Sequence, residues 1–199
     1  MSKRNYRSIL ISGFLLLVTH YCFAQSAMLS KGSTAPVFSA KASESGNEFD
    51  FSLEKVLARG PVVIYFYPSA YTGGCDLEAH TFAEYKDSFA LVGASIIGVS
   101  ADDIQRLKSF SADPEFCAGK FPVASDPGGE IAARYGLTIN PPREGAKDLR
   151  GQQITHGFIP RTTFVINKDH KIVAAFSSQT DHLSPDEHVK KSLAAVKAL

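Results

Sequence analysis

The run Val62 to Tyr67 limits the fold more than any other feature of this chain. It is an unbroken series of β-branched and aromatic residues without polar alternation, which is typical of a strand buried on both faces. The turn-rich stretch 68–74 follows, and from Cys75 to about Leu91 the apolar residues recur at helical spacing. These residues therefore predict a strand, a loop and a helix, with Cys75 in the first turn of the helix.

The rest of the chain continues the alternation of strands and helices. We expect a hairpin within 41–51, strands at 95–99, 121–124, 162–166 and 172–176, and helices at 52–58, 100–110 and 184–197. Such an order predicts an α/β protein with a thioredoxin-like fold, in which helices cover both faces of a mixed, mostly parallel central sheet. The long irregular stretch 138–155 indicates a loop that is either functional or mobile.

The first residues differ in character from the rest. Basic residues precede the apolar stretch 9–18, and small residues follow at 22–24, as in a signal peptide. We therefore expect residues 1–24 to be removed, residues 25–199 to form one domain, and the protein to be exported to a bacterial periplasm. The apolar stretch is short for a membrane span, which needs about 20 residues, so no stable membrane association is expected; an uncleaved anchor is the alternative.

The charge of the chain is balanced. Lys and Arg total 21 against 20 for Asp and Glu, and the basic residues form no long run. This pattern gives no electrostatic footprint for nucleic acid or an anionic membrane. The expected partner is a small molecule or another protein.

Cys75 and Cys117 are the cysteines left after removal of the signal peptide. In an oxidising compartment such a pair commonly forms a structural disulfide. Cys75, however, lies at a helix N-terminus, where the macrodipole and free N–H groups favour the thiolate and lower the thiol pKa. Because only the thiolate is nucleophilic, Cys75 is the candidate nucleophile.

The segment from Pro68 to Cys75, with the sequence PSAYTGGC, resembles the P-x-x-x-T-x-x-C signature of peroxiredoxins. The segments 121–126 and 160–166 also occur in the order seen in that family. The chain is most similar to the bacterioferritin comigratory protein group of the AhpC/TSA family. The resemblance implies a peroxidase that needs no metal or other cofactor and reduces hydrogen peroxide and organic hydroperoxides through a sulfenic acid on Cys75.

The resemblance also assigns roles around Cys75. It implies that Pro68 shields the thiol, that the Thr72 hydroxyl binds the peroxide, and that Arg161 holds both thiolate and substrate. A guanidinium suits this role because it stays charged and offers several donors; a structural salt bridge is the alternative for Arg161. Glu78 is a candidate for contact with Arg161, and the alternative is a first-turn acid that interacts with the helix dipole. Tyr67 and Tyr71 are candidates to line the entrance, and the alternative is packing beside the buried strand.

The resolving cysteine is less clear. Many members of the resembled group place it five residues after the first, where this chain has His80. Position i+5 points away from Cys75 on a helix, so His80 is expected on the surface. Cys117 matches a later position used by other members and is the candidate to form an intramolecular disulfide with Cys75, which a thioredoxin-like or other thiol protein would reduce. We expect a monomer rather than a dimer.

Other functions use the same residues. Cys75 and Cys117 could form a redox sensor or adaptor switch with little turnover. A dithiol oxidoreductase needs a C-x-x-C motif, which residues 72–78 lack. A copper carrier would pair Cys75 with histidines, but the histidines show no ligand spacing, and no metal site is expected.

Overall fold

A computed structural model describes residues 27–199 of the chain. Within this range seven strands form one sheet in the order β2-β1-β5-β4-β3-β6-β7. The strands are β1 (Ser39–Glu44), β2 (Asn47–Ser52), β3 (Val62–Phe66), β4 (Ser95–Ser100), β5 (Val123–Ser125), β6 (Thr162–Ile166) and β7 (Ile172–Ser177).

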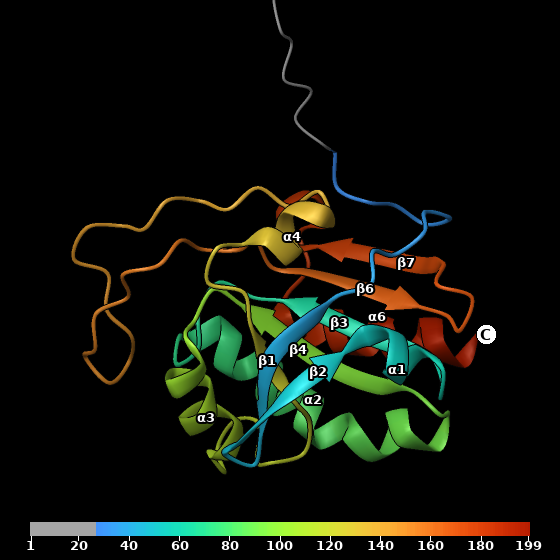
Figure 1. Cartoon of the computed structure of the whole chain (residues 1–199), viewed down its shortest axis with the longest axis horizontal. Coiled ribbons are helices and arrows are strands. Elements are labelled where there is room, and N and C mark those ends of the chain that lie inside the picture. The colour runs from blue at the N-terminus through green and yellow to red at the C-terminus, as the bar shows by residue number, and fades with distance from the viewer. Residues whose placement is uncertain (1–26) are drawn as a thin grey trace, which may run out of the picture.

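The sheet is mixed, as predicted, but it is not mostly parallel. Only β3–β4 and β4–β5 pair in parallel, whereas the β1–β2, β1–β5, β3–β6 and β6–β7 pairs are antiparallel. The physical reason is that a hairpin joins each side of the β3-β4-β5 unit. Each hairpin adds one antiparallel pair within itself and another where it meets the unit (Figure 1).

The helices are α1 (Leu53–Leu57), α2 (Gly73–Leu91), α3 (Ile104–Ala112), α4 (Glu130–Arg134), α5 (Ser178–Asp181) and α6 (Pro185–Lys197). Ser52 caps α1 and Ser184 begins α6 with a capping box, both where the sequence predicts a start. The predicted helix 100–110 begins too early. Asp103 caps α3, because its carboxylate accepts from the Arg106 N–H, and Ser100 instead ends β4.

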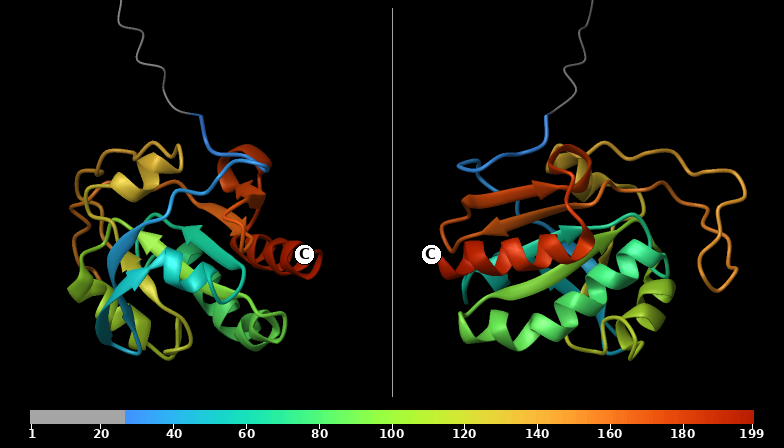
Figure 2. Two further views of the ribbon diagram at one scale, coloured as in Figure 1. Left: turned by 45° about the vertical axis from the view of Figure 1, so that its right-hand side comes forward. Right: turned by 180° about the vertical axis from the view of Figure 1, so that it is seen from behind.

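Two apolar cores lie on the two faces of the sheet. Alternate side chains of β3 enter them: Val62, Ile64 and Phe66 pack with α1 and α4, while Val63 and Tyr65 pack with α2, α3 and α6. Figure 2 shows α2 and α6 side by side across one face. The prediction of a strand buried on both faces is confirmed, and so is the thioredoxin-like arrangement of helices on both faces.

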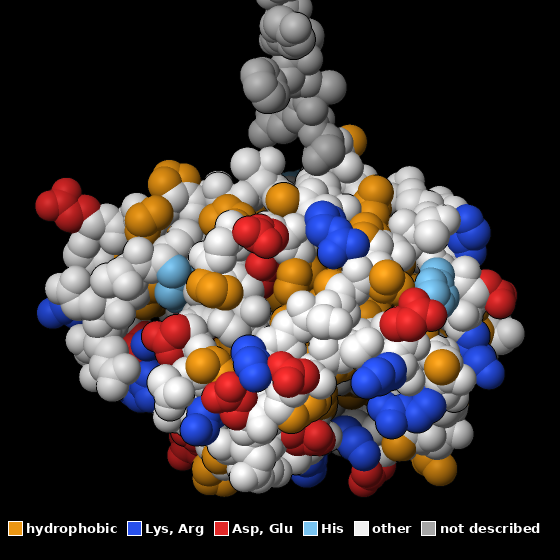
Figure 3. Space-filling view, in the orientation of Figure 1, with side chains coloured by type: hydrophobic (Ala, Val, Ile, Leu, Met, Phe, Trp, Pro, Cys, Tyr) orange, Lys and Arg blue, Asp and Glu red, His pale blue; other side chains and the backbone are white. Residues whose placement is uncertain are grey.

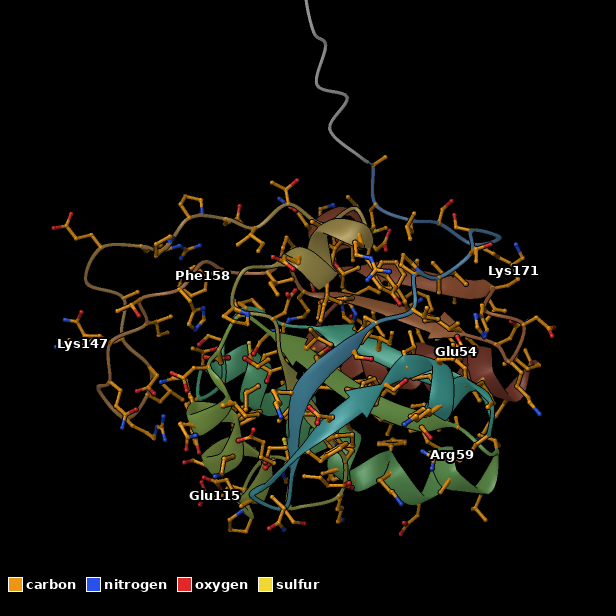
Figure 4. All side chains as sticks on the ribbon, in the orientation of Figure 1. Glu54, Arg59, Glu115, Lys147, Phe158 and Lys171 are labelled. Carbon is orange, nitrogen blue, oxygen red and sulfur yellow. The ribbon has the colours of Figure 1, made fainter. Side chains whose placement is uncertain are left out.

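Residues 138–159 leave the sheet as a long arm without a helix or strand (Figure 1). The arm folds back on itself through isolated bridges, Asn140 with Phe158 and Lys147 with Gln153. Figure 4 labels Lys147 and Phe158 along it. The sequence predicted an irregular segment here, and the structure shows that it forms one wall of a pocket described below.

The surface carries charges of both signs. On the face seen in Figure 3, acidic and basic side chains are interspersed. Over residues 27–199, no helix combines the length and the apolar character needed to cross a membrane. The predicted signal peptide at 1–24 lies outside the described residues.

Candidate active site

Cys75 lies where β3 gives way to α2. The strand ends at Phe66, the loop 67–72 follows, and Cys75 is the third residue of the helix. The Cys75 N–H donates to the Thr72 carbonyl at 2.8 Å, and the Thr72 hydroxyl donates to the Ser69 carbonyl at 2.7 Å. The thiol sits at the helix start predicted from the sequence, although Cys75 is only 2% exposed.

Arg161 reaches Cys75 from the neighbouring strand. It precedes β6, which pairs antiparallel with β3 so that Thr162 lies opposite Phe66. This register brings the guanidinium to the start of α2, with Nη2 donating to the Cys75 Sγ at 3.2 Å. The buried Glu78 carboxylate, one turn along α2, accepts from Nη1 of the same guanidinium. Arg161 and Glu78 thus lie where the sequence-based hypothesis needs them.

The thiol pKa differs from the sequence prediction. Burial raises the pKa of the Cys75 thiol, and the Arg161 guanidinium, the Ser69 backbone and the Thr72 hydroxyl oppose that shift only in part. The expectation that the helix start would lower the pKa is therefore wrong for this closed conformation. Burial also raises the pKa of Glu78, to about 7, against the opposing charge of Arg161. Among the groups that lower the pKa of Cys75, the Arg161 guanidinium has the largest effect.

Cys117 lies in a turn just after α3 and is fully buried. Both cysteines within residues 27–199 are free thiols. Burial, together with the negative charges of Asp113 and Asp76, raises the pKa of Cys117 well above its usual value. The neighbouring Phe116 ring packs edge-on against the Tyr71 ring at 5.6 Å. The segment carrying Cys117 therefore packs directly on the loop that carries the active-site signature.

Other predicted residues fall in different places. Tyr67 is 1% exposed and stacks on Tyr65 with ring centroids 5.4 Å apart, so the prediction that it lines the entrance is wrong; it belongs to the core under α2. Tyr71 is buried as well. His80 is exposed as expected, with Nδ1 2.9 Å from the Glu115 carbonyl oxygen.

Pro68 and Thr72 line an open pocket of about 550 Å³. The arm supplies its other walls, which combine apolar side chains with charged ones: Arg143, Glu144, Lys147, Ile154, Phe158 and Ile159. The Arg143 guanidinium lies over the Phe158 ring, 5.5 Å from its centroid. A molecule larger than water can thus approach the Thr72 side of the buried thiol.

Sequence reasoning missed Asp102 altogether. This buried carboxylate accepts from the Ser69 hydroxyl at 2.9 Å and from the Ala70 N–H at 2.8 Å, so it fixes the loop that precedes Cys75. A signal was present, because Asp102 follows the end of β4, which runs parallel to β3. The carboxyl ends of adjacent parallel strands meet at the same edge of a sheet.

The described residues offer no group of three or more His, Cys, Asp or Glu side chains placed to hold a metal ion. The chemistry on view is that of a thiol, a guanidinium and a hydroxyl. A cysteine presented to a guanidinium at a helix start, on a thioredoxin-like fold, defines a thiol-based redox enzyme.

Comparison with known proteins places this enzyme in a family. The sequence model of the AhpC/TSA family matches residues 31–175. The chain belongs to the AhpC/TSA family, the peroxiredoxins, and is a thiol-dependent peroxidase.

Named relatives agree with this assignment. A Mycobacterium tuberculosis protein named as a peroxiredoxin is 35% identical over 147 residues, which cover 74% of this chain and 84% of the relative. The crystal structure of the peroxidoxin BcpB from the same species superposes with a TM-score of 0.70 at 32% identity, covering 86% of this chain and 98% of that one. The bacterioferritin comigratory protein of Xanthomonas campestris has a TM-score of 0.61 at 29% identity, covering 79% of this chain and 90% of that one.

Proposed function

We propose that Cys75 is the peroxidatic cysteine and that Arg161 and Thr72 are its catalytic partners. The observation that carries the proposal is the Arg161 Nη2 at 3.2 Å from the Cys75 Sγ. The same guanidinium can stabilise the thiolate before the reaction and the negative charge that moves onto the leaving oxygen during it. Pro68, beside Thr72 in the pocket wall, would limit access of water to the thiol.

The first step is a two-electron transfer from sulfur to peroxide. The Cys75 thiolate attacks the terminal peroxide oxygen, an S–O bond forms, and the O–O bond breaks. The remaining oxygen leaves as water or an alcohol after taking a proton, and Cys75 becomes a sulfenic acid. Arg161 and the Thr72 hydroxyl would donate to the two peroxide oxygens while this charge moves.

We propose that Cys117 resolves the sulfenic acid. Its thiolate attacks the Cys75 sulfur, a disulfide forms, and the hydroxyl of the sulfenic acid leaves as water. A dithiol protein of the thioredoxin type then reduces the disulfide and becomes a disulfide itself. The packing of Phe116 on Tyr71 supports the pairing, because it puts both cysteine-bearing segments in one apolar core. Both segments must open locally for the two sulfurs to meet.

The pocket next to Thr72 supports organic hydroperoxides as substrates besides hydrogen peroxide. It is about 550 Å³ and partly apolar, which exceeds what hydrogen peroxide needs. The similar Xanthomonas campestris protein was described in a study of its alkyl peroxide reduction activity. We propose alkyl hydroperoxides as substrates here on these two grounds.

The deciding experiment follows Cys75 oxidation by hydrogen peroxide in residues 25–199, with intact mass recorded for the wild type and Cys117→Ser. We expect the wild type to end with the loss of two hydrogens. The variant should accumulate a sulfenic or overoxidised Cys75, and its steady-state turnover with a thiol reductant should fall at least about tenfold. A mass loss that survives Cys117→Ser would overturn the assignment of Cys117. Oxidation no faster than that of a free thiol would overturn the assignment of Cys75.

We also propose export, with residues 1–24 as a cleaved signal peptide, and a monomeric mature protein. The support for export is the sequence pattern of the N-terminus alone. Expression of the full chain in a bacterial host, followed by N-terminal sequencing of the periplasmic fraction, tests the cleavage. Retention of Met1 would contradict it, and light scattering of the purified product measures its mass in solution.

A further inference from the structure

Four segments of the chain meet at the carboxylate of Asp102, and one of them is α3, whose Arg106 Nε lies 2.9 Å from Oδ1. From the active-site loop it accepts the Ser69 hydroxyl at 2.9 Å and the Ala70 N–H at 2.8 Å. From the end of β4 it accepts the Ser100 hydroxyl at 2.7 Å. From the arm 138–159 it contacts His156, whose Nε2 lies 2.8 Å from Oδ1. Asp102 is fully buried, so the arm reaches the active-site loop through one desolvated charge.

The two ring nitrogens of His156 both face acceptors. Nε2 faces the Asp102 carboxylate at 2.8 Å, and Nδ1 faces the Gly157 carbonyl oxygen at 2.8 Å. A neutral imidazole carries one N–H and can satisfy only one of these acceptors, whereas the imidazolium donates to both. Burial disfavours the charged ring, but the hydrogen bond and charge of Asp102 outweigh it and raise the pKa of His156. The imidazolium satisfies both acceptors, and the neutral ring satisfies only one.

Arg106 forms a second link between the arm and the loop. Its Nη2 donates to the Ala70 carbonyl at 2.8 Å and to the buried Asp148 carboxylate of the arm at 2.8 Å. Beside it, the Leu149 N–H donates to the Tyr71 carbonyl at 3.0 Å. The arm thus contacts residues 69–71 through Arg106 and directly at Tyr71, immediately before Thr72 and Cys75.

The contacts with the arm keep Tyr71 in a strained backbone conformation. Its backbone has φ of +59°, in the left-handed region, which is costly for a residue with a side chain. The Arg150 guanidinium of the arm lies 3.2 Å from the centroid of the Tyr71 ring and covers it. A strained residue that is held by contacts with other segments relaxes when those contacts weaken. The loop 69–72 can therefore open when its contacts with the arm are lost.

We propose that His156 is a positioning residue for Cys75: the imidazolium, acting through Asp102, holds the loop 69–72 in the closed conformation, and loss of its proton releases the loop so that Cys75 can reach Cys117. The inference rests on the proposed peroxidase cycle and adds a pH-dependent balance within it. Below the His156 pKa the closed, peroxide-reactive form is favoured. Above that pKa the opening needed for the disulfide becomes easier.

The charged groups around His156 come from every segment packed on it. Asp102 and Asp103 precede α3, and Arg106 lies within it. Asp148 and Arg150 belong to the arm. Asp103, Arg106 and Arg150 line the pocket of about 370 Å³ into which His156 opens. Asp102 is the acid that contacts the ring, and the charge of Arg106 opposes its protonation. The pH response should therefore follow the His156–Asp102 pair.

The test measures amide exchange at Ala70 in the reduced protein, whose N–H donates to Asp102, and the rate of disulfide formation after a pulse of peroxide. Both are followed from about pH 6 to about pH 8.5 in the wild type, H156N and H182N. His182 is exposed and lies outside residues 138–159 in the sequence, so H182N is the matched control. In the wild type, exchange corrected for its intrinsic rate should rise roughly tenfold across this range, the loss expected for one charged hydrogen bond.

In H156N, exchange at Ala70 should already be roughly tenfold faster at the low pH and should lose its pH dependence. Disulfide formation should be faster by a similar factor there, and overoxidation of Cys75 should need a correspondingly higher peroxide concentration. H182N should behave like the wild type. Ionisation of Cys117 contributes to the disulfide rate in all three proteins alike, so the difference between variants isolates His156.

Equal exchange at Ala70 in the wild type and H156N at every pH would overturn the proposal. If H156N does not fold, H156Q is measured in its place, and exchange at Ala70 equal to that of the wild type at every pH overturns the proposal as well. The exchange measurement does not require Cys117. Exchange that follows the expectation while no disulfide forms would therefore support the role of His156 and sink only that of Cys117.

Discussion

Cys75 and Cys117 lie in the same apolar core, yet the charges next to the two thiols have opposite signs. Cys75 faces the Arg161 guanidinium, whereas Cys117 faces the carboxylates of Asp113 and Asp76. Burial raises the pKa of both thiols, but only Cys75 has a cation that opposes the rise. The comparison teaches that charge placement, rather than burial, distinguishes the two thiols.

Removal of the Arg161 guanidinium should abolish most of the difference in reactivity between the two thiols. We expect Arg161→Met to slow oxidation of Cys75 by about 100- to 1000-fold, the cost of losing a donor at a developing negative charge. Arg161→Lys keeps the charge but not the simultaneous contacts with Cys75 and Glu78, and should fall between. Stopped-flow measurement with hydrogen peroxide checks both, with the exposed Arg134→Met as control. An unchanged rate in Arg161→Met would show that Cys75 does not need the cation.

Removing a carboxylate from the Cys117 side should stabilise the protein. Asp76 is 6% exposed, neither of its oxygens makes a hydrogen bond of ordinary geometry, and burial raises its pKa from 3.8 to about 6. The folded state therefore holds this proton more tightly than the unfolded state. The free energy of unfolding accordingly falls as the pH rises from about 4 to about 6, and the loss is complete above that range.

The Asp76→Asn substitution removes this pH-dependent loss of stability. We expect the variant to be about 1–2 kcal/mol more stable than the wild type near pH 7.5, with no gain below about pH 4, in urea unfolding at a series of pH values. It should also lower the pKa of Cys117. Asp87→Asn, which removes an exposed carboxylate from the same helix, is the matched control and should give no such gain. A gain of the same size at acid pH would contradict the electrostatic explanation.

The smallest effect is expected at His80, where other members of the family group place the resolving cysteine. Its side chain is 50% exposed, and its Nδ1 lies 2.9 Å from the Glu115 carbonyl oxygen in the Cys117 segment. His80→Ala should change the rate of Cys75 oxidation by less than about twofold. It should speed disulfide formation by about two- to threefold, since one exposed hydrogen bond holding the segment is lost. A tenfold loss of peroxide reactivity would mean that His80 acts in the chemistry.

The sequence was most informative where the signal is local. The structure confirms the predictions that depend on neighbouring residues. These are the apolar run of β3, the helical spacing after Cys75 and the helix starts at Ser52 and Ser184. Arg161 lies 86 residues from Cys75, and only the family resemblance pointed to it. Local pattern cannot pair residues so far apart in the chain.

The failures have a physical cause in common. The pKa of Cys75 was predicted from its helix, but the apolar core that includes α3 and the Cys117 segment buries the thiol and raises its pKa instead. The Asp102–His156 pair, 54 residues apart in sequence, depends on how the arm folds back. Burial and long-range pairing arise from tertiary structure, which periodicity and spacing do not encode.

Different parts of the arm contact the body of the protein and line the pocket. It is tied to the body of the protein at Asp148, Leu149 and His156, while the pocket wall at Arg143 and Lys147 lies between its base and those ties. Mutations at Arg143, Glu144 and Lys147 can therefore accumulate without disturbing the loop before Cys75. This separation lets evolution retune which hydroperoxide is accepted while the chemistry of the thiol is inherited unchanged.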